Sequence, residues 1–223
     1  MARKLCVFDL DGTLVDSLAD LTWSLNQALR EIGLAPYTAQ EVRLMVGNGI
    51  SRLVERALAG RGAKSEKMRE ELVPAFLGIY QGHCTCQTKP YPGVAESIKR
   101  LRSHGMRTAV LSNKADPMAH TIVTALFGEK SFDLVRGKAN GLPLKPDPAA
   151  VWWICDTLCV PVKDCCLVGD SGVDVATAQK AGVPCFGVTW GFRDRAELES
   201  FGAYRIANTA AELEAQLLEW EKI

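Results

Sequence analysis

The sequence has no excess charge of either sign, because its 223 residues contain 26 lysines and arginines and 26 aspartates and glutamates. A basic surplus is what holds nucleic acid or an anionic membrane by electrostatic attraction, so we expect neither as a partner. A small anionic ligand is compatible with this balance, because the charge around one site can differ from the total. The sequence also lacks internal repeats and low-complexity segments. No heptad pattern indicates an interface, which leaves a monomer or a homodimer open.

Long apolar runs are missing as well. None approaches the roughly 20 residues that span a bilayer. The apolar stretch 5–8 is too short for the h-region of a signal peptide and is followed by two aspartates, so we expect a cytoplasmic protein. Its eight cysteines should stay reduced there. Cys6, Cys165, Cys166 and Cys185 lie in or beside apolar runs, where cysteine packs as a small hydrophobic residue.

Two patterns alternate along most of the chain. Short apolar runs that favour strands alternate with longer stretches of helical periodicity. The runs are continuously apolar, as is typical of strands buried on both faces of a sheet. This alternation predicts an α/β fold with a doubly wound parallel sheet. The predicted strands are 5–10, 108–111, 132–135, 165–168 and 185–188.

One long segment breaks the alternation. Between Asp16 and about Gln81 the periodicity is helical and indicates a bundle of helices. Pro74 lies within the last of these helical patterns, where it should either kink the helix or mark its start. An insertion of this kind is typical of a cap or lid, although rigid decoration of the sheet is the alternative.

This pattern divides the chain into two parts. We assign residues 1–15 and 88–223 to an α/β catalytic core and residues 16–87 to an inserted helical cap domain. If the insertion is a lid, the linkers near 15–17 and 82–92 would be its hinges.

Two carboxylates follow the first predicted strand. Residues i and i+2 of an extended segment point the same way, so Asp9 and Asp11 can face one pocket. Such a pair repels unless a cation lies between the groups or one takes up a proton. An ionised Asp9 can attack phosphorus, and a protonated Asp11 can donate to the leaving oxygen and later deprotonate water. Gly12 permits a tight turn beside a phosphate, although Asp-Gly is also an ordinary turn sequence.

Ligands of open parallel sheets bind beyond the carboxyl ends of the strands, and further polar residues follow those ends. Ser112 and Asn113 offer neutral hydrogen-bond donors for phosphate oxygens, or they cap the helix that follows. Lys145 is held extended by Pro146 and offers a fixed positive charge, unless it is a solvated surface lysine.

The apolar run 165–168 leads into Asp170, and Asp174 follows one helical turn later. Hard oxygen ligands from Asp9, Asp170 and a backbone carbonyl suit Mg²⁺. A simple loop with a helix N-cap is the alternative, but it does not explain the placing of the second aspartate.

Together these motifs closely resemble those of the haloacid dehalogenase superfamily, over essentially the whole chain. The resemblance rests on Asp9-x-Asp11-Gly-Thr, Ser112-Asn113, Lys145-Pro146 and Gly169-Asp170-Ser171-x-x-Asp174, with the helical insertion in the place of an α-helical cap.

The resemblance implies a Rossmann-like core in which Asp9 is the nucleophile and Asp11 is the acid and base. It also implies Mg²⁺ held by Asp9, the Asp11 carbonyl and Asp170, with Asp174 supporting the metal site.

The same resemblance implies residues that contact the substrate. Ser112 and Lys145 would position the phosphoryl group. Gly12, Thr13 and Asn113 are further candidates for binding the substrate.

The second aspartate separates the reactions of this superfamily. Dehalogenases lack an acid such as Asp11, so its presence favours a Mg²⁺-dependent phosphomonoester hydrolase. Phosphonatases use a cap lysine, and no lysine lies between Lys4 and Lys64. A sugar-phosphate mutase of the β-phosphoglucomutase type shares the motifs and is an alternative. A non-catalytic regulatory protein is a second one, but it would be expected to lose a motif residue.

The cap segment 46–50 and the later segment 187–192 are similar to loops of phosphoglycolate phosphatases. Asn48 would donate a hydrogen bond to the substrate, and Arg52 would pair with a substrate carboxylate. The alternative is an interhelical turn with Asn48 as N-cap and Arg52 in solvent. Phosphoglycolate or a similar small phosphomonoester is therefore the expected substrate.

A compact cluster in the second linker contains His83, Cys84 and Cys86. It lacks the usual Cys-x₂-Cys spacing of a zinc site and an obvious fourth ligand. Whether these residues bind anything is left open by the sequence.

Overall fold

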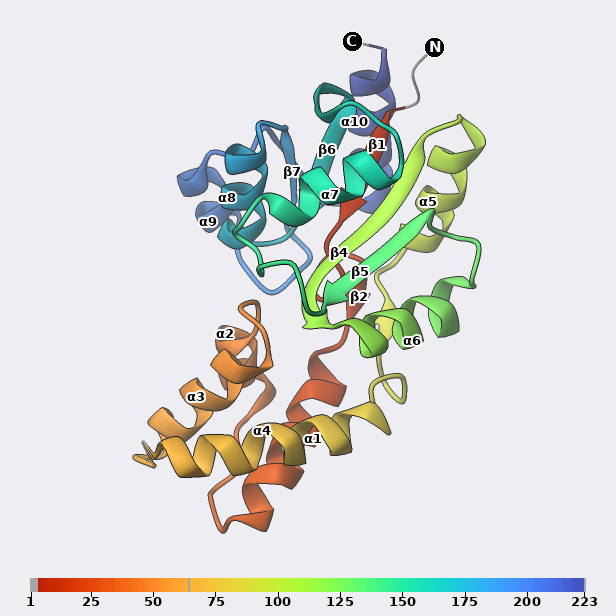
Figure 1. Cartoon of the computed structure of the whole chain (residues 1–223). Coiled ribbons are helices and arrows are strands. Elements are labelled where there is room, and N and C mark those ends of the chain that lie inside the picture. Colours follow the sequence, from red (N-terminus) through yellow and green to blue (C-terminus); the bar gives the residue numbers. More distant parts are fainter. Residues whose placement is uncertain (1–3, 64, 223) are drawn as a thin grey trace. The chain divides into compact units, whose positions relative to one another are not determined.

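The computed structural model describes residues 4–63 and 65–222. The chain forms two compact units, one of Met1–Asp16 with Pro90–Ile223 and one of Ser17–Lys89. We call them the core unit and the cap unit (Figure 1). The boundaries lie one and two residues later than those assigned from the sequence.

The core unit contains a six-stranded sheet in the order β5-β4-β1-β6-β7-β8, and neighbouring strands pair in parallel. The chain builds outwards from β1 in both directions, which is the predicted doubly wound, Rossmann-like arrangement. The strands are β1 (Leu5–Phe8), β4 (Arg107–Ala115), β5 (Leu134–Lys138), β6 (Cys165–Gly169), β7 (Cys185–Val188) and β8 (Arg205–Ala207).

Several strands differ from the prediction. The strand β5 begins two residues and ends three residues later than the predicted 132–135. The strand β4 continues beyond Leu111 to Ala115, through side chains that are polar and nevertheless buried. A search for apolar runs cannot detect this extension, because the side chains of its residues are polar. The three-residue edge strand β8 was not predicted, since so short a segment carries no clear period.

Helices cover the sheet on both faces. Figure 1 shows α7 (Ala149–Thr157), α8 (Gly172–Ala181) and α9 (Arg195–Phe201) on one side of it, and α5 (Val94–Ser103) and α6 (Asp116–Phe127) on the other. Leu5, Val7 and Leu167 from the sheet form one buried cluster with residues of α7, α8 and α9. The next helix, α10 (Ala210–Glu221), brings Trp220 against Phe186 of β7, with their ring centroids 6.1 Å apart. Each large apolar side chain buried in this way contributes about 1.5–3 kcal/mol.

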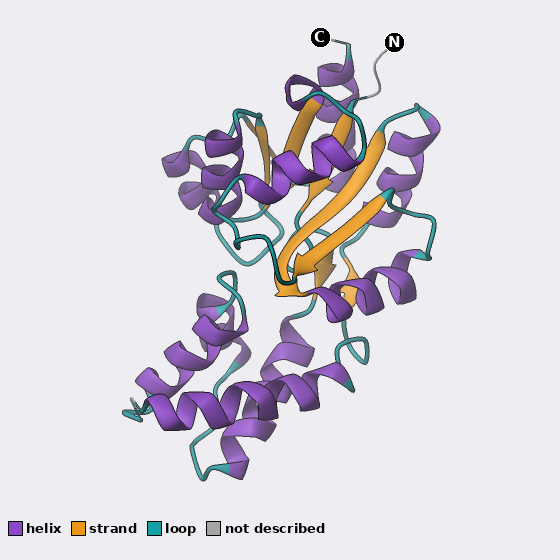
Figure 2. Cartoon of the chain, viewed as in Figure 1, coloured by secondary structure: helices purple, strands orange, loops and turns teal. Residues whose placement is uncertain are grey.

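The cap unit consists of helices and loops (Figure 2). The helices are α1 (Leu18–Glu31), α2 (Ala39–Met45), α3 (Ile50–Gly60) and α4 (Glu66–Gln81). Leu25, Leu29, Val54, Phe76 and Tyr80 are fully buried and form its apolar interior. The prediction that Pro74 marks the start of a helix is wrong, because α4 begins eight residues earlier and Pro74 lies inside it.

Short strands lie at the boundaries between the units. β2 (Val15–Asp16) and β3 (Lys89–Pro90) pair as a two-stranded sheet. Among the residues that the structure describes, none of the helices has the length and apolar character needed to cross a membrane.

Candidate active site

The parallel sheet brings the predicted motifs to one edge, because the carboxyl ends of all its strands lie there. Asp9 follows β1 directly, and Ser112 and Asn113 lie in the last part of β4. Asp170 follows β6, and Asp174 lies in the first turn of α8.

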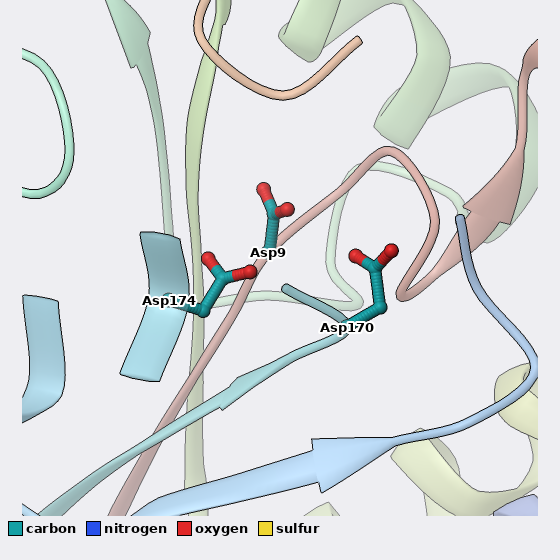
Figure 3. Close-up of side chains that lie close together, drawn as sticks. All are labelled: Asp9, Asp170 and Asp174. Carbon is teal, nitrogen blue, oxygen red and sulfur yellow. The ribbon is translucent and has the colours of Figure 1, made fainter. Parts of the chain in front are cut away.

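Three of these side chains form an acidic cluster. Asp9, Asp170 and Asp174 each place one carboxylate oxygen within 4.8 Å of the others. Figure 3 shows the three side chains coming from the end of β1, the end of β6 and α8, with their carboxyl groups turned to the same side. In the described part of the chain, no other group of three histidine, cysteine or carboxylate side chains gathers as closely.

Burial and mutual repulsion change the acidity of this cluster. Burial raises the pKa of Asp9 to about 8; nearby Lys145 lowers it in part, and Asp174 and Asp170 raise it further. Burial, followed by the charge of Asp174, raises the pKa of Asp170 to about 7. A cation among the three carboxylates would remove this repulsion. The donor set contains only hard oxygen atoms, which fits Mg²⁺ or a similar divalent ion.

Lys145 supplies a positive charge inside the cluster. Its Nζ lies 2.8 Å from Asp9 Oδ1 and 2.6 Å from Asp174 Oδ1, and its side chain is 2% exposed. Burial alone would lower its pKa, but Asp174 and Asp9 outweigh burial and raise the pKa, so the ammonium group stays charged. The alternative of a solvated surface lysine is therefore wrong.

Asn113 holds the loop that carries this lysine. Its Nδ2 donates to the backbone carbonyl of Lys145 over 3.0 Å, and the backbone N–H of Lys145 donates to its Oδ1 over 2.8 Å. We assign Asn113 the positioning of Lys145, while its predicted contact to a substrate stays a prediction. The helix-cap alternative for Ser112 and Asn113 is wrong, because the N-cap of α6 is Ala115.

Asp174 has protein donors on both carboxylate oxygens. Lys145 donates to Oδ1, and the Ser171 side chain donates to Oδ2 over 2.7 Å as part of a capping box at the start of α8. The helix N-cap considered as the alternative for this loop is therefore present at Ser171, and the reason given against it is wrong, because the capping box accounts for the position of Asp174. These contacts fix Asp174 in place and make it the support of Lys145. A Cβ on Gly169 would lie 2.3 Å from Asp174 Cβ, so the close approach of strand and helix requires glycine there.

Asp170 is oriented by two donors from other segments. Thr13 Oγ1 donates to its Oδ1 over 3.1 Å, and the backbone N–H of Phe192 donates to its Oδ2 over 2.7 Å. Thr13 and Phe192, the last residue of the segment 187–192, thus orient Asp170 within the core unit. The predicted contact of Thr13 to a substrate stays a prediction. Gly12 has a φ of +87°, and a Cβ there would lie 2.5 Å from Asp170 Oδ2, so both the turn and the contact require glycine.

One residue of the site was missed by sequence reasoning. Lys114, in β4, places Nζ 2.9 Å from Oδ2 of Asp11, and its side chain is 2% exposed. Its position directly after Ser112-Asn113 was the available signal. Its partner could not be inferred, because the contact depends on β4 lying beside β1. Ser112 accepts a hydrogen bond from the backbone N–H of Lys114 over 3.2 Å.

The candidate residues of the cap unit have partners within that unit. Asn48 Oδ1 accepts from Arg56 over 2.8 Å, and Arg52 pairs with Glu55 over 2.7 Å on the surface of α3. The alternative of Asn48 as an N-cap is wrong, because Gly49 is the N-cap of α3. Contacts of Asn48 and Arg52 to a substrate stay predictions.

Arg56 is a second residue that the sequence did not point to. Besides its contact to Asn48, its Nη1 donates to the carbonyl of Met45 over 2.7 Å. It therefore ties the loop before α3 to the end of α2.

His83 in the second linker has partners within the cap unit. His83 Nε2 lies 3.5 Å from Oδ1 of the buried Asp20, and the His83 ring stacks on Trp23 with centroids 3.8 Å apart. Cys84 is buried and Cys86 is exposed, and neither joins a metal-binding group within the described residues.

Asp20 ties the second linker to α1. The backbone N–H groups of Gln87 and Thr88 and the hydroxyl of Thr88 donate to its carboxylate over 2.7–3.0 Å. These hydrogen bonds satisfy a buried carboxylate, which is otherwise costly.

Comparison with known proteins gives consistent results. The family described as haloacid dehalogenase-like hydrolase matches residues 6–188. The phosphoglycolate phosphatase of Colwellia psychrerythraea is 31% identical over 215 residues, which cover 95% of each chain. The phosphoglycolate phosphatase of Cereibacter sphaeroides is 39% identical over 189 residues, covering 84% of this chain and 85% of that protein.

A solved structure gives the same relation. A proposed phosphoglycolate phosphatase from Lactobacillus delbrueckii subsp. bulgaricus superposes with a TM-score of 0.92 at 32% identity. The superposition covers 97% of this chain and 99% of the other.

Proposed function

Because the chain belongs to the family of haloacid dehalogenase-like hydrolases, we propose that it is a Mg²⁺-dependent phosphatase of small phosphomonoesters that forms an aspartyl-phosphate on Asp9. 2-Phosphoglycolate is the first candidate substrate, since relatives of 31% and 39% identity are named phosphoglycolate phosphatases. The observation that carries the proposal is the buried cluster of Asp9, Asp170 and Asp174 around the ammonium group of Lys145.

The charges of the site support a divalent cation. Asp9, Asp11, Asp170 and Asp174 carry four negative charges when ionised, and Lys114 and Lys145 carry two positive ones. The remaining double negative charge would repel a phosphate dianion. Asp9, Asp170 and the Asp11 carbonyl are the proposed ligands. When bound, the ion supplies charge neutralisation and alignment of the phosphoryl group.

The residues of the chain account for both halves of the reaction. An oxygen of the Asp9 carboxylate attacks phosphorus, the ester bond breaks, and Asp11 donates its proton to the leaving alkoxide. Asp11, now ionised, removes a proton from the water that attacks the aspartyl-phosphate, which releases phosphate and restores Asp9. Lys145 remains charged throughout and stabilises the phosphoryl oxygens electrostatically. Asp174 and Asn113 hold Lys145 in place for this task.

The test is a panel of small phosphomonoesters, 2-phosphoglycolate among them, incubated with the full-length chain and Mg²⁺ while free phosphate is measured. Asp9→Asn is expected to abolish phosphate release while the circular dichroism spectrum stays that of the wild type. Turnover by Asp9→Asn near the wild-type rate would refute the nucleophile, and unchanged rates in excess EDTA would refute the metal. An isomerised sugar phosphate without free phosphate would instead identify a mutase.

A further inference from the structure

The ion pair between Lys114 and Asp11 lies outside the steps assigned so far. We propose that Lys114 is a positioning residue, whose ammonium group holds the Asp11 carboxylate, once it has given up its proton to the leaving group, in the orientation from which it removes a proton from the attacking water. The inference rests on the proposed function and adds a residue to it.

The contact is close and shielded from solvent. Lys114 Nζ lies 2.9 Å from Asp11 Oδ2, and the two side chains are 2% and 14% exposed. Coulomb attraction at this distance is several times stronger inside a protein than in water. A carboxylate held in this way does not rotate freely about its side-chain bonds, and proton transfer depends on such a fixed geometry.

The backbone of Lys114 is fixed as well. The pairing of β4 with β5 shifts register between Leu111 and Ala115, and Lys114 lies within that irregularity. Irregularities of this kind re-aim side chains at the ends of strands. A Cβ on Gly137 of β5 would lie 2.6 Å from the Lys114 carbonyl oxygen, so the two strands touch at that point. With the backbone fixed on this side, the Lys114 side chain extends to the loop after β1.

The two buried lysines of the site serve different carboxylates. Lys145 contacts Asp9 and Asp174, whereas Lys114 contacts Asp11. Loss of Lys145 should therefore disturb the transfer of the phosphoryl group to Asp9. Loss of Lys114 should disturb the hydrolysis of the aspartyl-phosphate, in which Asp11 acts as an ionised carboxylate.

A double-mutant cycle of Lys114→Met and Asp11→Asn tests this assignment. Acid–base groups contribute about 10²–10⁴-fold to rates, so loss of their orientation should lower kcat by about 10- to 100-fold. KM should change by no more than about threefold, since Lys114 binds no substrate in this assignment. Added to Asp11→Asn, Lys114→Met should lower kcat no further. Phosphoenzyme trapped by acid quench should accumulate in Lys114→Met, as in Asp11→Asn.

Two further variants serve as controls. Lys163→Met makes the same change at an exposed lysine two residues before β6, at the amino end of that strand, and should leave kcat unchanged. Lys114→Arg keeps the buried charge but displaces the carboxylate with a larger head group. If circular dichroism shows that Lys114→Met does not fold, Lys114→Arg replaces it in a second double-mutant cycle with Asp11→Asn. The expected outcome is again a lower kcat in the wild-type background and no further decrease in the Asp11→Asn background.

The outcomes separate the inference from the proposed function. Equal losses from the lysine substitution in wild-type and Asp11→Asn backgrounds, or a raised KM at unchanged kcat, would overturn the positioning role and leave the phosphatase intact. Failure of the wild-type chain to release phosphate from any ester would overturn the proposed function and this inference with it.

Discussion

The affinity of the acidic cluster for Mg²⁺ should depend steeply on pH. In the metal-free protein, burial and neighbouring charges raise the pKa of Asp9 to about 8 and that of Asp170 to about 7. A metal ion binds the ionised carboxylates, so binding must displace any proton that they hold. Because both pKa values are raised, the affinity is greatest above the higher value and falls as the pH is lowered through both.

The size of the effect follows from these two values. At about pH 6, the competing protons lower the affinity by about 100-fold at Asp9 and about 10-fold at Asp170, since each pH unit below a pKa contributes about tenfold. If both groups must be ionised, the total is about 1000-fold, or about 4 kcal/mol at 1.36 kcal/mol per unit. Binding at that pH should release up to two protons.

Titration calorimetry with MgCl₂ between about pH 6 and pH 9, in two buffers of different ionisation enthalpy, measures both the affinity and the released protons. Asp170→Asn should weaken binding and flatten the pH dependence. Asp156→Asn, at an exposed aspartate of α7, should leave both unchanged. An affinity that is constant over this range, or binding without proton release at the acid end, would refute the role of burial and repulsion.

Three further substitutions test individual contacts. Lys145→Met removes the positive charge between Asp9 and Asp174 and should lower kcat by at least about 100-fold, because an electrostatic stabiliser of the transition state is lost. Steady-state kinetics measures this loss, and a decrease in kcat below tenfold would contradict the role of Lys145. Gly12→Ala should destabilise the fold by about 1–2 kcal/mol, because residue 12 has a left-handed backbone conformation, and it should also weaken Mg²⁺ binding. Denaturant unfolding measures the first effect and calorimetry the second; wild-type values in both would contradict the need for glycine in this turn. Asp20→Ala leaves three donors without their acceptor and should cost about 3 kcal/mol in urea unfolding, more than Asp20→Asn, which keeps one acceptor oxygen. A loss below about 1 kcal/mol for Asp20→Ala would argue against the carboxylate as the essential acceptor.

Much of the fold follows from local features of the sequence. Continuous apolar runs such as 165–168 identify buried strands, because the side chains on both faces of such a strand are covered by helices and are therefore apolar. Strands alternating with helices then require parallel pairing. The helical periodicity between Asp16 and Gln81 identifies the cap unit in the same way, since one face of each helix must be apolar to be buried.

The acidic cluster could also be predicted from the sequence. Asp9 and Asp170 directly follow apolar runs, and a parallel sheet brings the ends of its strands together. Asp174 follows one helical turn after Asp170, which keeps it near the same edge. The positions of these three residues along the chain therefore predict that they meet.

The partners of the other polar residues were decided only by the tertiary structure. Lys114 could have bound solvent, a phosphate or any nearby carboxylate, and it contacts Asp11 in a fold that pairs β4 with β1. Asn113 fitted a helix cap equally well, but it binds the backbone of the Lys145 loop. An apolar side chain needs only burial, which a periodic pattern reveals. A charged or amide group needs a specific partner at about 3 Å, and the packing of distant segments determines which partner lies there.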